Sequence, residues 1–456
     1  MAADGPNGTW RRSQNSSRLR IFRPAGGINL KKRILVSFIG KSRAVPGRSQ
    51  RSGYSAVHYR FPAEGSSPEW TAPPTSLFGA ALVKYLERNN QSVDRWIVLG
   101  TDQSDWGTLI HALPTDDAGR AEEELASIKR LIEDDAFTQS DLDQWQATIQ
   151  AELPNLLCSF KIVGDASERA SQMNIWNAIV ESVEDLDKIV LDVTHSFRHM
   201  PVIASFMINA LRPIKQVSDV DLYYGGLDLA ESGNEAKVIH IGLVRELAKI
   251  SDAVSTYRDT GNYGQILQQL KLHDSVDAIK VLFSEETNLP AKTAALALRH
   301  RVNSFVGDPI ENAIVPLLNV PLDWVIEKSN AQRMASKTRF AYEHGQYFKA
   351  ITLLWESILT AGCESSPESP DSGRHEGREV GEKYLRGNLG SSDRETMRNV
   401  KDLRNSVAHG TISDRAVIIK ALESQADFER VFERGLSLMT RLLTHIEDAK
   451  NTSVHD

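Results

Sequence analysis

The chain has 456 residues, of which 41% are hydrophobic and 25% charged, and its formal net charge is −7. This length exceeds what one ordinary core supports, so we expect two or three globular domains. The acidic balance excludes a protein that coats nucleic acid generally, so any RNA contact must be local. The two cysteines, Cys158 and Cys363, exclude a disulfide framework and a multi-cysteine zinc site. No apolar run is long enough to cross a bilayer and no secretory signal is evident, so a cytoplasmic location is expected.

Residues 1–30 are predicted to form a flexible basic tail, because they are rich in Gly, Asn, Ser and Pro and show little periodicity. The arginines of this segment outnumber its single acid; they are Arg11, Arg12, Arg18, Arg20 and Arg23, against Asp4. We interpret the segment as a solvated tail; the alternative is an arm that contacts RNA.

From residue 31 to 245, apolar runs typical of buried strands alternate with amphipathic helical stretches. The expected strands are 33–40, 96–100, 159–163 and 188–193, and the expected helices are 77–86, 119–133, 140–153, 169–184 and the stretch after Pro201. Two further runs, 221–224 and 237–241, are expected to form a terminal hairpin. The alternation predicts an α/β fold with a doubly wound, Rossmann-like, mainly parallel sheet.

The most informative stretch runs from Lys188 to Pro201. Its apolar start, Ile189-Val190-Leu191, is typical of a strand buried on both faces, and Pro201 suits the first turn of a helix. Polar and basic residues fill the turn between the two elements. Free N–H groups and the positive end of the helix dipole favour phosphate at such a turn. The alternative is that Asp192 and Thr194 only cap the helix and that His195 is a satisfied polar residue near the core.

Polar groups follow three of the predicted strands, and parallel strands end at the same edge of a sheet, where ligands of such folds bind. Gly40-Lys41-Ser42 is not a Walker motif, and taken alone a tight surface turn explains it. The candidate ligand-binding residues are Gly40, Lys41, Ser42, Thr101, Ser104, Thr194, His195, Ser196 and Arg198.

The segment Asp192-Val-Thr-His-Ser-Phe-Arg-His-Met-Pro201 resembles the Asp-x-Thr-His-Gly-Phe-Arg-x-x-Pro signature of CRISPR-associated proteins with a CARF domain. Phe38-Ile-Gly40, Tyr59-Arg-Phe-Pro62 and Val98-Leu-Gly-Thr101 with Trp106 are similar to other landmarks of that family. The resemblance covers roughly residues 31–245 and implies a sensor of cyclic oligoadenylate. Cyclic tetra-adenylate is favoured because it is common in the family. Ser196 stands where the family usually has Gly, the residue that allows positive φ most readily.

After residue 245 the strand signals end, and we expect a helical connector over 246–329 and a helical bundle over 330–450. Expected helices of the bundle are 331–342, 346–361, 392–408 and 412–443, while 363–381 is rich in Ser, Pro and Gly and is predicted to be a loop. Gly410 is expected to end the helix that precedes it.

A second chemical site is predicted at Arg404-Asn405-x3-His409. By itself Arg-x4-His is frequent, and a surface Arg with a terminal His explains it. In a C-terminal helical bundle it resembles the HEPN ribonuclease motif, the usual partner of the CARF signature. Arg404, Asn405 and His409 offer a cation, a positioning group and a proton acceptor, which suffice for attack by an RNA 2′-hydroxyl on its neighbouring phosphate without a metal. At about 100° per residue, Arg404 lies about 140° from His409, so one straight helix does not bring all three together. In the family, two chains combine their motifs across a dimer axis.

We therefore expect an RNA endonuclease of type III CRISPR defence that a cyclic oligoadenylate activates, with single-stranded RNA as substrate and a homodimer or higher homo-oligomer as the working state. No cofactor or metal is expected. One alternative is a non-catalytic regulator whose CARF domain controls partner binding. Another is a ring nuclease that opens its own cyclic activator.

Overall fold

A computed structural model describes residues 31–41, 56–65, 67–114, 119–226, 235–287, 291–411 and 413–452. The predicted basic tail, residues 1–30, lies outside this range. The chain divides into two compact units, Met1–Arg245 and Glu246–Asp456. Within the described residues, no helix has the length and apolar character needed to cross a membrane.

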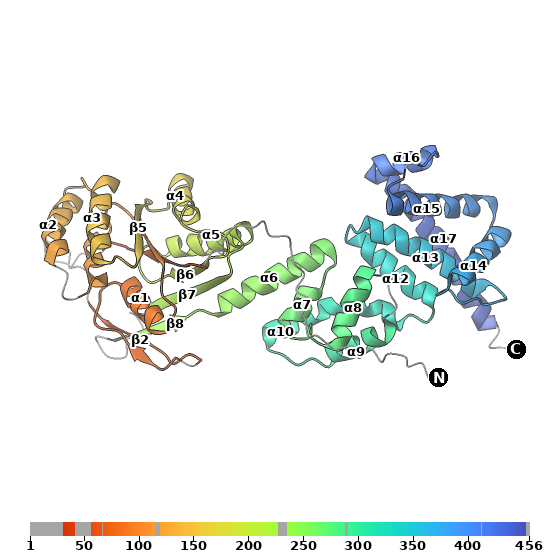
Figure 1. Ribbon diagram of the computed structural model, residues 1–456, viewed down its shortest axis with the longest axis horizontal. Coiled ribbons are helices and arrows are strands. Elements are labelled where there is room, and N and C mark those ends of the chain that lie inside the picture. The colour runs from red at the N-terminus through yellow and green to blue at the C-terminus, as the bar shows by residue number, and fades with distance from the viewer. Residues whose placement is uncertain are drawn as a thin grey trace, which may run out of the picture. The chain divides into compact units, whose positions relative to one another are not determined.

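The first unit is built on an eight-stranded sheet in the order β3-β2-β8-β7-β6-β1-β4-β5 (Figure 1). The strands are β1 (Arg33–Phe38), β2 (His58–Phe61), β3 (Trp70–Thr71), β4 (Arg95–Gly100), β5 (Leu157–Ile162), β6 (Lys188–Asp192), β7 (Asp219–Gly226) and β8 (Glu235–His240). The five central neighbours from β7 to β5 are all parallel, whereas β8 runs antiparallel to β7. The predicted fold class and the predicted terminal hairpin are confirmed.

Helices cover both faces of this sheet, which is why its central strands are continuous apolar runs. One face packs on α1 (Phe78–Arg88), α2 (Gly119–Glu133) and α3 (Gln139–Glu152), and the other on α4 (Arg169–Val180) and α5 (His199–Lys215). Alternate residues of β1 enter the two cores: Leu35 lies in the first, and Ile34 and Val36 lie in the second. The short helix η1 (Trp106–Ala112) continues from the end of β4.

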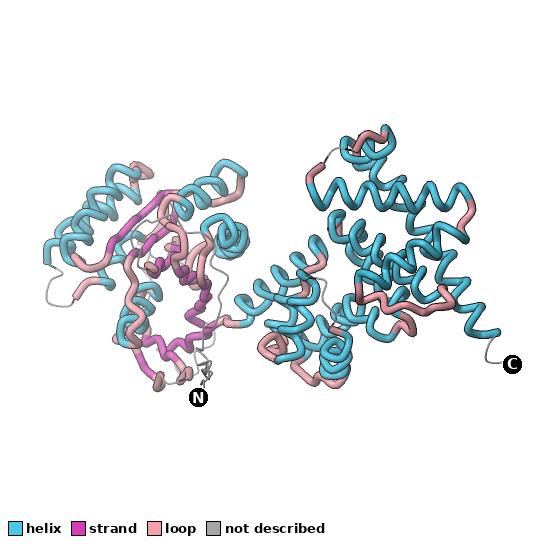
Figure 2. Tube along the Cα trace, turned by 45° about the vertical axis from the view of Figure 1, so that its right-hand side comes forward, coloured by secondary structure: helices cyan, strands magenta, loops and turns pink. Residues whose placement is uncertain are grey.

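The second unit contains only helices in its described residues (Figure 2). Its first core is formed by the longer helices α6 (Leu243–Thr260), α7 (Gly264–Gln269), α8 (Val276–Thr287) and α9 (Lys292–Asn303), followed by the short segments α10 (Pro309–Ile314), η3 (Val315–Leu318), α11 (Asn319–Leu322) and η4 (Asp323–Ile326). A second core is formed by α12 (Asn330–Glu343), α13 (Tyr347–Ser365), α14 (His375–Asn388), α15 (Ser391–His409), α16 (Ala416–Glu423) and α17 (Gln425–Thr452). α13 is the central helix of this core, because α12, α14, α15 and α17 all pack against it.

The prediction of a loop over 363–381 is wrong, because α13 extends to Ser365 and α14 begins at His375. The glycines of this segment allow neighbouring backbone and side chains to approach closely, and they do not mark a loop. A Cβ at Gly381 would lie 2.6 Å from Cys363 Sγ, and a Cβ at Gly377 would lie 2.0 Å from the carbonyl oxygen of Asp371. The predicted helix 412–443 is two helices, which Ser424 separates.

Candidate functional site

The first candidate site lies where the direction of the sheet's connections reverses. After the edge strands β2 and β3, the chain forms β4 and β5 on one side of β1, and it then returns to form β6 and β7 on the other side of β1. The register pairs Val36 with Leu191 on one side and Ser37 with Val98 on the other. The carboxyl ends of β6, β1 and β4 are therefore adjacent, and this reversal is where ligands of doubly wound folds bind. The structure brings the three predicted polar strand ends together.

The ends of β1 and β4 are joined by Ser104, which is fully buried. Its hydroxyl donates to the carbonyl oxygen of Ile39 at 2.8 Å and accepts from the backbone N–H of Thr101 at 2.8 Å. The indole N–H of Trp106 donates to the carbonyl oxygen of Thr101. Ser104 therefore fixes the backbone at this edge of the sheet, and its buried hydroxyl does not face a ligand. Lys41 is exposed, with its Nζ 3.4 Å from Gln103 Oε1, whereas Ser42 lies outside the described residues.

The end of β6 is held by Asp192 and Thr194. Asp192 Oδ1 accepts from the backbone N–H of Thr194 at 2.9 Å, and Thr194 Oγ1 accepts from the N–H of Gly225 at 2.8 Å, which ties the turn to β7. Complete burial raises the pKa of Asp192 to about 7, against the lowering effect of its hydrogen bonds with Thr194 and Ser37. Both residues therefore bind the backbone of the turn and of β7, and neither caps α5, which the alternative interpretation of the sequence expected.

His195 points into the first unit, where only 4% of the residue is exposed. Its Nε2 accepts from the backbone N–H of Phe78, the first residue of α1, at 3.1 Å. Burial lowers the pKa of His195 to about 4, so the ring is neutral at pH 7 and its proton lies on Nδ1. His195 thus satisfies a free N–H at the start of α1. This geometry favours its interpretation as a satisfied core residue over a direct ligand contact.

Ser196 adopts a φ of +91°, a region that side chains with a Cβ rarely occupy. Its hydroxyl lies 3.0 Å from Met200 Sδ in α5. The turn therefore keeps the backbone that glycine would give most easily, although the residue is serine. The departure from the usual motif changes the side chain and leaves the backbone conformation in place.

The outer surface of the turn is formed by Phe197, Arg198 and His199, all of which are exposed. Arg198 immediately precedes α5, and the rings of Phe197 and His199 stack with centroids 5.9 Å apart. The His199 ring is fixed by a contact of 2.6 Å between its Nε2 and the carbonyl oxygen of Asp165. The guanidinium group of Arg198 and the positive end of the α5 dipole suit an anionic ligand. Sequence reasoning missed Phe197 as part of this surface, although its place inside the signature could have indicated it; His199 was counted among the basic groups of the turn but not among the candidate ligand-binding residues.

The second candidate site lies at the end of α15. Arg404 Nη1 donates to Asn405 Oδ1 at 3.1 Å, and the buried Nε of Arg404 has no hydrogen-bond partner among the described residues. His409 is exposed and is the last residue of the helix. Gly410 follows with a φ of +62°, and its N–H donates to the carbonyl oxygen of Ser406, so the predicted helix end is confirmed. The structure joins Arg404 and Asn405, and it leaves His409 about 140° from Arg404 around the helix axis.

A doubly wound sheet with polar turns at the carboxyl ends of its central strands is typical of a class of ligand-binding domains. The profile of one such family, described as the CARF domain of the CRISPR system endoribonuclease Csx1, matches residues 34–228. Residues 34–228 are therefore similar to the CARF domain of CRISPR-associated proteins, in agreement with the sequence signature.

Two individual proteins are also similar to this chain. The CRISPR-associated protein MJ1674 of Methanocaldococcus jannaschii is 23% identical in an alignment of 359 residues that covers 71% of this chain and 55% of that protein. The chain therefore spans about half the length of this curated relative. Among solved structures, Enterococcus italicus Csm6 bound to cyclic hexa-2′-fluoro-hexa-dAMP matches with 13% identity and a TM-score of 0.33, over 91% of this chain and 94% of that one.

Proposed function

We propose that the protein is a metal-independent endonuclease of single-stranded RNA that a cyclic oligoadenylate activates. The observation that carries this proposal is the presence, on one chain, of a CARF domain and of Arg404-Asn405-x3-His409 at the end of a bundle helix. The division of the second unit into a connector and a HEPN ribonuclease domain is part of the proposal.

The activator would bind at the carboxyl ends of β1, β4 and β6. Lys41 and Arg198 supply cations, Ser196 supplies a hydroxyl group, and the start of α5 supplies the positive end of its dipole for the phosphates. Ser104, Thr194 and His195 hold the backbone beneath them. A cyclic oligoadenylate with an even number of nucleotides has twofold symmetry, so it fits a site shared by two copies of this domain. Cyclic tetra-adenylate is the first ring to test.

The outer face of α5 supports such a pairing, because it is apolar where a solvated helix is normally charged. Val202 is 54% exposed, Phe206 is 72% exposed and Ile214 is 63% exposed, and all three follow the turn that carries Arg198. Exposed apolar patches of this kind mark protein interfaces. We propose that two chains meet on this face in a twofold dimer, which places one ligand on the axis.

In the nuclease site, His409 would accept the proton of the attacking 2′-hydroxyl, while Arg404 would stabilise charge on the phosphate and Asn405 would position it. A dimer would also bring His409 of one chain towards Arg404 of the other. This removes the difficulty that one helix presents the two side chains in different directions.

The test is an RNA-cleavage assay with cyclic tri-, tetra- and hexa-adenylate, each in the presence and absence of EDTA. We expect one ring to activate cleavage, EDTA to leave the rate unchanged, and the products to carry 2′,3′-cyclic phosphate and 5′-hydroxyl ends. Products with 5′-phosphate ends, or a rate that EDTA abolishes and magnesium restores, would contradict the mechanism. Opening of the ring without RNA cleavage would favour the ring nuclease instead.

A further inference from the structure

α15 carries more than the Arg404–His409 motif. Arg394, Arg398, Lys401, Asn405 and His409 recur at intervals of four, three, four and four residues. At about 100° per residue, these five positions lie within about 80° of arc, on one side of the helix. The three cations therefore form a stripe, here called the α15 stripe, that leads along the helix to Asn405 and His409.

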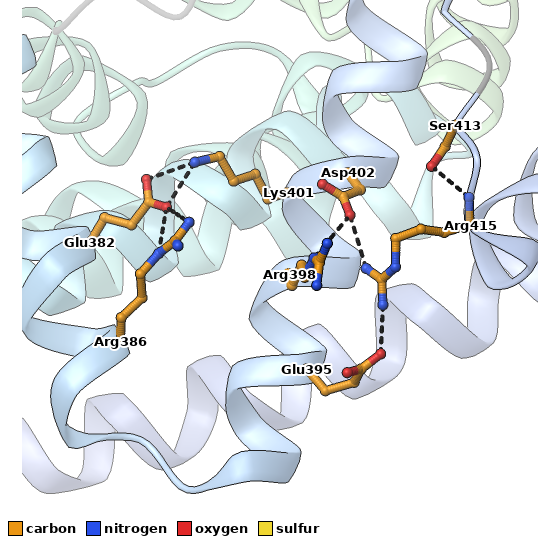
Figure 3. A network of polar contacts seen from close by, with 8 residues as sticks. All are labelled: Glu382, Arg386, Glu395, Arg398, Lys401, Asp402, Ser413 and Arg415. Atoms are coloured by element: carbon orange, nitrogen blue, oxygen red, sulfur yellow. Dashed lines mark hydrogen bonds and ion pairs between the residues drawn. The ribbon is translucent and has the colours of Figure 1, made fainter.

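The carboxylates near this stripe are bound by Arg386 and Arg415 from outside the stripe and by Lys401 from within it (Figure 3). Glu382 of α14 accepts from Arg386 at 2.5 and 3.0 Å and from Lys401 at 2.7 and 3.0 Å. Arg415 binds Asp402 at 2.9 Å and Glu395 at 2.5 Å. Arg441 binds Asp393 at 2.6 Å. The cations number seven, namely Arg386, Arg394, Arg398, Lys401, Arg404, Arg415 and Arg441, and the carboxylates number four, namely Glu382, Asp393, Glu395 and Asp402. The region thus has an excess of three positive charges on a chain whose net charge is −7.

The guanidinium groups of Arg394 and Arg398 are only weakly neutralised by their neighbours. The Arg394 guanidinium donates from Nη1 to the carbonyl oxygen of Arg386 at 3.3 Å, which is a neutral partner. The Arg398 side chain is 68% exposed, and its Nε lies 3.8 Å from Asp402 Oδ2, too far for a hydrogen bond. Asp402 is already bound more closely by Arg415. Arg394 and Arg398 therefore face solvent one helical turn apart, a separation of about 6 Å along the axis.

Lys401 is held in place by contacts with α14 and α13. Its ammonium group is bound by Glu382 and lies 5.4 Å from the centre of the Trp355 ring in α13. Trp355 belongs to the buried core of the bundle. Since α13 also packs directly on α15, the backbone under Arg398 and Asn405 is held by the core rather than by surface contacts alone.

We propose that Arg394 and Arg398 form a phosphate-binding track that holds single-stranded RNA along α15 and directs it to Asn405 and His409. This inference rests on the proposed function, because it takes RNA as the ligand of that same site. Arginine binds phosphate through two parallel N–H groups, and a flexible single strand can follow cations that are spaced by one helical turn. An acidic protein would need such a local track, since its overall field repels RNA.

The binding test uses His409→Ala protein, so that RNA stays intact, and a fluorescently labelled single-stranded RNA whose affinity is measured at several salt concentrations. The track variant is R394Q/R398Q. Loss of two phosphate contacts on a single strand should lower the slope of log K against log salt by about 1.4 and weaken binding about 25-fold at 0.1 M salt. The matched control is R258Q/K280Q, which removes two exposed cations from α6 and α8 of the same unit. The control should leave the slope and the affinity unchanged.

Circular dichroism of each variant establishes that the bundle is folded. An unchanged slope in folded R394Q/R398Q protein, or an equal loss in the control, would overturn the track. So would an absence of RNA binding by the His409→Ala parent.

A kinetic measurement separates failure of the track from failure of the proposed function. In protein that retains His409, R394Q/R398Q should raise KM for RNA and leave kcat close to normal. If no cyclic oligoadenylate activates cleavage but RNA still binds with the predicted slope change, the proposed function fails and the track stands. If cleavage is activated and KM is insensitive to R394Q/R398Q, the track fails and the proposed function stands.

Discussion

Acidification from pH 7 to pH 5 should destabilise the first unit through His195. The ring is buried and neutral, and its Nε2 accepts from the N–H of Phe78, so protonation removes the acceptor and places a charge in the core. Its pKa falls to about 4 in the folded protein, below the ordinary value of about 6.5. The unfolded chain therefore binds more protons between these two values, and stability is lost as the pH falls through them.

The magnitude follows from the two pKa values. At pH 5 the unfolded histidine is almost fully protonated and the folded one is almost fully neutral, which lowers the free energy of unfolding by about 2 kcal/mol relative to pH 7. At pH 4 the loss approaches about 3 kcal/mol. Asp192 acts in the opposite direction, because burial raises its pKa to about 7 and the folded state then gains a proton first as the pH falls. A direct pH titration of the native protein would therefore mix the two effects.

The substitution His195→Gln separates them, since the amide oxygen can still accept from Phe78 and does not titrate. Hydrogen exchange of the amides in α1, at pH 7 and pH 5 and corrected for intrinsic rates, measures the free energy of opening. The native protein should lose about 2 kcal/mol more than His195→Gln over this range. Equal losses in the two proteins would refute the buried, neutral state of His195. Ligand affinity should fall over the same pH range, because Ser196 and Arg198 lie on the same turn.

Three further outcomes are expected. Ser196→Gly should be more stable than Ser196→Ala by up to about 1 kcal/mol in thermal unfolding. Glycine relieves the positive φ of +91°, and the freedom that it adds to the unfolded chain limits the gain. The reverse order of stability would contradict this prediction. Arg198→Ala should raise the concentration of activator that is needed and leave the maximal cleavage rate near normal. His409→Ala should lower the cleavage rate by about 10²–10⁴-fold and leave the activator affinity, measured by calorimetry, intact. Phe206→Asp should convert a dimer to a monomer in light scattering and weaken activator binding, and an unchanged mass would reject the α5 interface.

Several features were determined by the sequence alone, because they depend on neighbours in the chain. The apolar run of β6 and the polar turn before Pro201 specify a buried strand followed by a helix. Gly410 specifies the end of α15, because glycine adopts a left-handed conformation without a steric cost. The alternation of strands and helices specified a doubly wound sheet, and with it the adjacency of the three polar strand ends.

Other features were decided only by the tertiary structure, because they depend on partners distant in the chain. His195 belongs to a sensor signature, yet its acceptor nitrogen is used by Phe78, 117 positions away. Gly377 and Gly381 look like loop residues, but the backbone of Asp371 and the surface of α13, respectively, require their lack of a side chain. The charge of the α15 stripe also depends on distant partners, since Arg415 occupies Asp402 and Glu395 and leaves Arg398 exposed. Sequence periodicity reports which side of an element is buried, but it does not report which group on another element meets it there.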